Sequence, residues 1–146
     1  ARRISAITQD ITEFLSKIKL KKPVINPGFK VAYQAPCSLS HGQKIVKEPV
    51  LLLEKCGFEV FQPRDQHQCC GSAGTYNLLQ NEIATSLRDK KVSALAALAP
   101  ETIASGNIGC ITQLNNGRGT KLPCAVVHTV ELLDWATGGP FPSSIK

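Results

Sequence analysis

The sequence lacks methionine altogether, has few aromatic residues and contains no apolar run of membrane-spanning length. Without a methionine, a chain that begins at Ala1 is expected to be a piece excised from a longer protein. No secretory signal or disulfide framework is apparent, so we expect a cytoplasmic protein, with at most peripheral association at the inner membrane. At 146 residues, one domain buries a sufficient core without disulfides, so the six cysteines are expected to be free thiols.

The chain also has few aromatic residues among its basic ones. Its net charge is +6, and much of the excess lies near the N-terminus, at Arg2, Arg3, Lys17, Lys19, Lys21 and Lys22. Nucleic-acid binding favours aromatic side chains interleaved with basic ones, and the one Trp, two Tyr and five Phe form no such series. A solvated basic face is therefore expected, and no nucleic acid is expected as a partner.

Hydrophobic spacing predicts one amphipathic helix over residues 2–20, followed by a linker marked by Pro23, Pro27 and Gly28. We expect this helix to pack on its own domain or on a neighbouring segment, with a membrane-surface role as the weaker alternative. The sequence therefore divides into an N-terminal helix and linker (1–29), a central domain (30–137) and a loose tail (138–146).

The central domain alternates strand and helix patterns. Strands are predicted at 30–34, 58–61, 102–105 and 125–128, and helices over 44–56, over 77–98 and after Thr129, which is a candidate N-cap. On the long helix, Arg88, Lys90 and Lys91 are expected to face solvent. This alternation predicts an α/β fold, with a mostly parallel sheet of about four strands covered by helices on both faces.

Four cysteines follow the carboxyl ends of these strands, where parallel sheets form their sites: Cys37, Cys69, Cys70 and Cys110. They are the candidate metal ligands, because thiols far apart in sequence can converge at one sheet edge. Cys56 and Cys124 do not share that placement and are expected to be small core or surface residues.

The stretch 67–76 places the adjacent thiols Cys69 and Cys70 before two glycines, Gly71 and Gly74, and a helical pattern. Adjacent cysteines rarely form a disulfide, because the preferred bridge geometry is hard to reach. Glycines let the backbone approach a bound group, and N–H groups at a helix start favour negative charge. We therefore predict metal or redox chemistry here, with Gly71, Gly74 and His67 as cofactor-binding residues.

The histidines are weaker ligand candidates than the thiols. His67 is expected to donate a hydrogen bond to a thiolate or to lie in a water-facing loop, and His41 is similar. His128, at a strand end, is expected in the core or at a helix cap. Gly71 and Gly74 form only Gly-x-x-Gly, which lacks the first glycine of the Gly-x-Gly-x-x-Gly dinucleotide-binding fingerprint. A Cys–His nucleophile pair would need a third residue to orient it, and the sequence does not establish one.

The cysteine spacing, with 69–76 and 107–110, resembles the cysteine-rich CCG family, and most closely its members in glycolate oxidase iron–sulfur subunits. This resemblance implies an electron-transfer domain with an iron–sulfur cluster of the 4Fe–4S type, or alternatively zinc. It also implies a flavin-containing partner subunit that carries the FAD and a missing N-terminal ferredoxin-like part. No complete active site is expected on this fragment, which would belong to a 2-hydroxy-acid oxidoreductase complex.

One departure from the family pattern concerns its final Cys-x-x-Cys, because Gln113 stands where the last cysteine is expected. Four thiols suffice by number for tetrahedral zinc or a four-cysteine cluster. Two alternatives therefore stay open. One is a zinc-binding or metal-free docking domain, and the other is a dithiol redox domain like that of heterodisulfide reductase.

Overall fold

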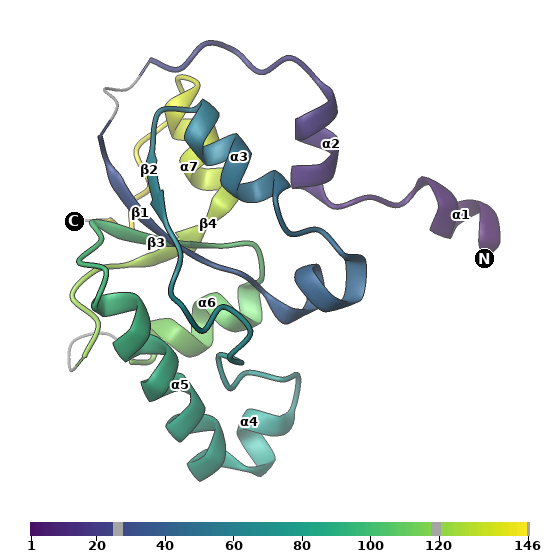
Figure 1. Cartoon of the computed structure of the whole chain (residues 1–146). Coiled ribbons are helices and arrows are strands. Elements are labelled where there is room, and N and C mark those ends of the chain that lie inside the picture. The colour runs from purple at the N-terminus through teal and green to yellow at the C-terminus, as the bar shows by residue number, and fades with distance from the viewer. Residues whose placement is uncertain (25–27, 118–120, 146) are drawn as a thin grey trace.

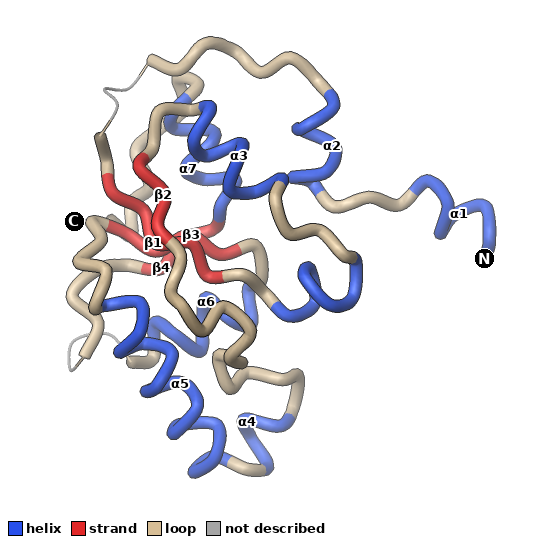
Figure 2. Tube along the Cα trace, in the orientation of Figure 1, coloured by secondary structure: helices blue, strands red, loops and turns tan. Residues whose placement is uncertain are grey.

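The computed structural model describes residues 1–24, 28–117 and 121–145, so the predicted linker residue Pro27 lies outside the described residues. A four-stranded sheet forms its centre, in the order β2-β1-β3-β4 (Figures 1 and 2). The strands are β1 (Lys30–Gln34), β2 (Glu59–Phe61), β3 (Thr102–Ser105) and β4 (Val126–His128), and every pairing is parallel. The predicted α/β fold with a parallel sheet is confirmed, with all four strands at or within one residue of their predicted positions.

Helices cover both faces of the sheet because successive strand residues point to opposite sides. On one face, Val31 and Tyr33 pack with helices α3 (Glu48–Lys55) and α7 (Thr129–Ala136). On the other, Ala32 packs with helices α5 (Asn81–Ala96) and α6 (Ile108–Asn115). Figure 1 shows these two helices together on one side of the sheet. Cys56 and Cys124 are buried in these two cores, as expected for core residues.

The predicted single helix over 2–20 is wrong, because two short helices, α1 (Arg2–Ile7) and α2 (Ile11–Lys17), replace it. A new helix begins after Asp10, because the Asp10 carboxylate accepts a hydrogen bond from the backbone N–H of Thr12 at 2.8 Å and caps α2. Helix α2 packs against α3, whereas α1 buries none of its residues and projects from the domain in Figure 1.

The long helix predicted over 77–98 is also divided, into α4 (Tyr76–Leu79) and α5, at the non-helical Gln80. On α5 the expected exposure of Lys91 is wrong, because this lysine is 0 % exposed, while Lys90 is exposed. The cap of α7 is His128 rather than Thr129: its Nδ1 accepts from Val130 N at 3.2 Å, and Glu131 accepts from His128 N. The alternative of a helix-capping histidine is thus confirmed.

Two helical segments were not predicted. Residues Ser38–Gln43 form a short π-helix, η1, and α6 begins directly after its N-cap Asn107. Both follow strand ends, so they position Cys37 and Cys110 beyond the carboxyl ends of β1 and β3. Within the described residues, no helix combines the length and apolar character needed to cross a membrane.

Two of the last described residues, Phe141 and Ile145, contact the domain. Phe141 packs edge-on against Trp135 with ring centroids 4.8 Å apart, and Ile145 is buried in the core that α3 and α7 share. The division into segments 1–29, 30–137 and 138–146 stays a prediction.

Candidate thiol site

A small cavity lies at the carboxyl edge of the sheet, and all four candidate ligands line it. Its walls are Gln34, Ala35, Cys37, Ser40, His41, Gln66, His67, Gln68, Cys69, Cys70 and Cys110. The expected convergence of thiols from three strand ends is therefore observed, and His67 lies with them. Gly71 and Gly74 do not line this cavity.

Each thiol is placed by the segment that follows its strand. Cys37 precedes η1, and Cys69 and Cys70 lie within the loop between β2 and α4. Cys110 lies in the first turn of α6, where the side chain of Asn107 accepts a hydrogen bond from Cys110 N at 3.1 Å. The same amide donates to Ser38 Oγ at 3.2 Å, so Asn107 ties the Cys37 segment to the Cys110 helix.

The sulfur atoms interact directly. Cys70 Sγ and Cys110 Sγ lie 3.1 Å apart in a buried hydrogen bond, and Gly71 N donates to Cys69 Sγ at 3.3 Å. The shared proton lowers the pKa of Cys70 and raises that of Cys110, while burial raises the pKa of Cys69. Cys37 is exposed, so the site has a buried thiol pair and an open side.

Two glycines allow the close packing that shapes this site. Gly71 has φ +86°, and a Cβ there would collide with the carbonyl oxygen of Ala84 on α5. At Gly109 a Cβ would lie 2.8 Å from Ser72 Oγ, so this glycine lets the loop after the thiol pair rest on α6. Gly74 has φ +64°, and no described side chain crowds the position where a Cβ would lie. Glycine is therefore favoured there by the backbone conformation alone.

The rings of His41 and His67 lie at the cavity with their centroids 5.7 Å apart. Within the described residues, no group of three or more His, Cys, Asp or Glu side chains is already arranged around a metal position. The donor chemistry nevertheless fits a thiolate-bound centre, because four thiols share one cavity and a backbone N–H already points at a sulfur. The ligand assignment stays a prediction.

Comparison with known proteins identifies the architecture. The model of the CCG family, described as a cysteine-rich domain, matches residues 31–115, which include all four cavity cysteines. The chain belongs to the CCG cysteine-rich domain family.

Similar proteins in this family include iron–sulfur and lactate-utilization proteins. The chain is 39% identical over 136 residues to the glycolate oxidase iron–sulfur subunit of Escherichia coli K12, covering 93% of this chain and 32% of that protein. It is 33% identical over 112 residues to a probable glycolate oxidase iron–sulfur subunit of Bacillus subtilis, covering 74% and 25%. Lactate utilization protein A of Bacillus licheniformis is 25% identical over 137 residues, with coverage of 92% and 58%. The chain thus spans only part of these relatives.

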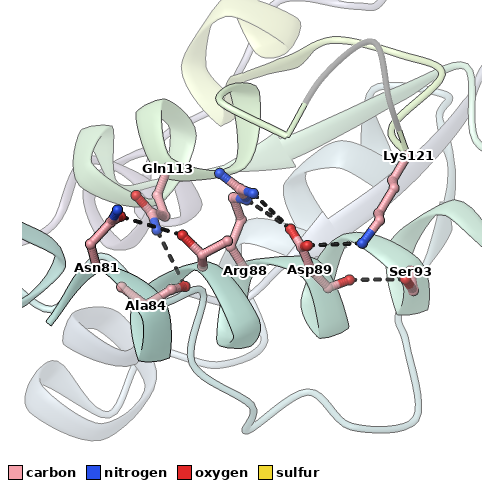
Figure 3. A network of polar contacts seen from close by, with 8 residues as sticks. Asn81, Ala84, Arg88, Asp89, Ser93, Gln113 and Lys121 are labelled. Carbon is pink, nitrogen blue, oxygen red and sulfur yellow. Dashed lines mark hydrogen bonds and ion pairs between the residues drawn. The ribbon is translucent and has the colours of Figure 1, made fainter.

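Gln113, which the sequence resemblance places at the family's last cysteine, makes its hydrogen bonds to the helices and does not line the cavity. It is buried, its Nε2 donates to Ala84 O at 3.4 Å, and its Oε1 accepts from Asn77 Nδ2 at 3.4 Å. Figure 3 shows the amide of Gln113 facing α5 at Ala84. In this family member, the position therefore joins α6 to its neighbouring helices and adds no fifth sulfur.

Lys91 is the site-associated residue that sequence reasoning missed. Its Nζ donates to Asp65 O at 3.2 Å and to Gln66 O at 3.1 Å, in the loop that leads to the thiol pair. Burial lowers the pKa of Lys91, whereas nearby Cys70 and Cys110 raise it. A signal existed in the sequence, because Lys91 shares a helical stripe with the buried Ala84 and Leu95.

Gln34, at the end of β1, forms part of the cavity wall, and its hydrogen bond to β3 can be tested by substitution. Ser105 Oγ donates to Gln34 Oε1 at 2.6 Å, and both side chains are buried. Replacing Gln34 with leucine leaves that hydroxyl without its acceptor and is expected to lower the free energy of unfolding by about 1–3 kcal/mol. Urea unfolding of Gln34→Leu, Ser105→Ala and the double variant measures this. If the double variant loses as much free energy of unfolding as the two single variants together, the hydrogen bond between Gln34 and Ser105 does not contribute to stability.

Proposed function

We propose that the chain is the C-terminal cysteine-rich domain of an iron–sulfur electron-transfer subunit in a glycolate-type 2-hydroxy-acid oxidising complex. The observation that carries this proposal is the convergence of Cys37, Cys69, Cys70 and Cys110 on one cavity. The 39% identity to the glycolate oxidase iron–sulfur subunit of Escherichia coli supports it.

The four cysteines would hold an iron–sulfur cluster, of the 4Fe–4S type in our proposal, which would supply one-electron transfer. The polypeptide contributes thiolates, a backbone donor from Gly71 to Cys69 Sγ and burial of Cys70 and Cys110. Hydrogen bonds to sulfur and exclusion of water both tune the reduction potential of such centres. His67 and His41 border the same cavity and would adjoin the centre.

The partners follow from the same proposal. A flavin-containing subunit that carries FAD would deliver electrons, and a ferredoxin-like N-terminal part of the same protein would exchange them. The relatives are longer than this chain, which covers 32% of the Escherichia coli protein, so there is room for such a part. Association of the complex with the inner membrane would be peripheral.

The test is to measure iron, zinc and acid-labile sulfide, with an absorbance spectrum, on protein purified without oxygen. We expect iron and sulfide in comparable amounts and broad visible absorption. Zinc without sulfide would overturn the electron-transfer proposal in favour of a structural zinc domain. Protein that takes up neither metal, even after reconstitution with iron and sulfide, would leave a metal-free docking domain.

The contact between Cys70 Sγ and Cys110 Sγ at 3.1 Å favours one second candidate, a dithiol redox domain. Oxidation would join these sulfurs and release two protons and two electrons, which reduce a disulfide substrate to two thiols. Incubation of metal-free protein with oxidised glutathione tests this candidate. A Cys70–Cys110 disulfide found by mass spectrometry, together with released glutathione, would support it, whereas unreacted thiols would exclude it.

A further inference from the structure

Lys91 is a charged side chain enclosed by the domain. It lies on α5 with 0 % exposure, and its ammonium donates to the carbonyls of Asp65 and Gln66. These carbonyls precede the thiol pair by a few residues, in the loop that lines the cavity at Gln66, His67 and Gln68. The lysine therefore supports the thiol loop from the side of the helix.

A buried ammonium is costly unless hydrogen bonds and opposite charge compensate for lost water. None of the ion pairs among the described residues includes Lys91. The groups near enough to raise its pKa electrostatically, once ionised, are Cys70, Cys110, Asp65 and Cys69. Metal binding would turn these thiols into thiolates, and the site would then supply negative charge opposite this lysine.

Helix α5 contacts both ends of the thiol loop. Ala84 O lies against Gly71, just after the thiols, and Lys91 holds Asp65 and Gln66, just before them. Ala84 and Lys91 are two helical turns apart, so they lie on the same face of α5. This face fixes where Cys69 and Cys70 stand relative to Cys110.

We propose that Lys91 is a positioning residue and the internal counter-cation of the thiol site: it anchors the loop before Cys69 and stabilises negative charge on the bound centre. This inference rests on the proposed function in its second part, because the charge concerns a thiolate-bound cluster. Its first part concerns the polypeptide alone. The two parts are therefore measured separately.

The first experiment follows amide hydrogen exchange in metal-free protein. In Lys91→Met, the backbone N–H groups of Gln68 and Gly71, which donate to Asp65 O and Cys69 Sγ, are expected to exchange at least tenfold faster. Exchange in β1 and β3 is expected to stay unchanged. Lys90→Met is the matched control, because it removes the same charge from an exposed neighbour on the same helix.

The second experiment measures the midpoint potential of the metal-loaded variants. Loss of a nearby cation disfavours the added electron, so Lys91→Met is expected to disfavour reduction at least tenfold, or about 59 mV for one electron. Lys91→Gln keeps a hydrogen-bond donor without charge, so it is expected to retain most of the loop protection and to show the lowered potential. A purely structural lysine would not move the potential in this variant.

The outcomes separate this inference from the proposed function. If the wild-type protein takes up no cluster, the proposed function and the charge role fail together, while the exchange experiment still decides the anchoring role. Equal exchange and equal potential in Lys91→Met and Lys90→Met would overturn the inference with the cluster in place. Global unfolding of both Lys91→Met and Lys91→Gln would also overturn it, because the lysine would then support the whole fold.

Discussion

Replacing Cys70 with alanine is expected to remove the bound metal, with iron and sulfide falling at least tenfold below the wild-type content. Cys70 is 2% exposed, lines the cavity and contacts Cys110 Sγ at 3.1 Å, so its loss takes away both a ligand and the partner of a second one. Without Cys70 three thiols line the cavity among the described residues, one fewer than a four-cysteine centre uses. Metal and sulfide analysis after anaerobic reconstitution measures the effect.

Cys56→Ala is the matched control for this experiment. Cys56 is also buried, at 1% exposure, but it belongs to the core between α3 and α7 and does not line the cavity. Both substitutions delete one buried sulfur, so each is expected to cost stability by about 1 kcal/mol through lost burial. Wild-type metal content in Cys70→Ala would contradict the assignment of Cys70 as a ligand. The same loss of metal in Cys70→Ala and Cys56→Ala would point to lost stability rather than to a lost ligand.

The sheet and the convergence of the thiols on one cavity could be predicted, because both follow from the pattern of apolar residues in the strands. The strands at 30–34 and 102–105 are buried on both faces, so they appear in the sequence as compact runs between turn residues. Parallel strands present their carboxyl ends at one edge, which brings Cys37 and Cys110 together without further information.

The rest of the site depends on tertiary contacts that hydrophobic spacing does not encode. A lysine among charged residues on a helix is usually solvated, and the burial of Lys91 depends on hydrogen bonds to the carbonyls of Asp65 and Gln66, which are distant in the sequence. Helix α6 was missed because Ile108 and Gly109 are weak helix formers, whereas the cap from Asn107 and packing on Ser72 establish its first turn.

Replacing Gly71 with alanine is expected to lower the free energy of unfolding of the metal-free protein by about 3–5 kcal/mol. A φ of +86° is unfavourable for an L-residue, at about 1–3 kcal/mol, and the added methyl group must also displace the Ala84 carbonyl. That carbonyl belongs to α5 and also accepts from Gln113 Nε2, so it cannot move without disturbing the contact between α5 and α6. Urea unfolding of both proteins under reducing conditions measures the difference.

Gly74→Ala separates the collision from the backbone requirement. Gly74 also has positive φ, at +64°, but in the described part of the chain no heavy atom beyond its own residue and its two neighbours lies within 4 Å of the added methyl group. Only the conformational cost of about 1–2 kcal/mol is therefore expected there. Equal losses in the two variants would mean that Gly71 matters for its φ alone. A larger loss at Gly71, accompanied by weaker metal retention, would mean that close contact with α5 holds Gly71 N against Cys69 Sγ and so sets the geometry of the thiol pair.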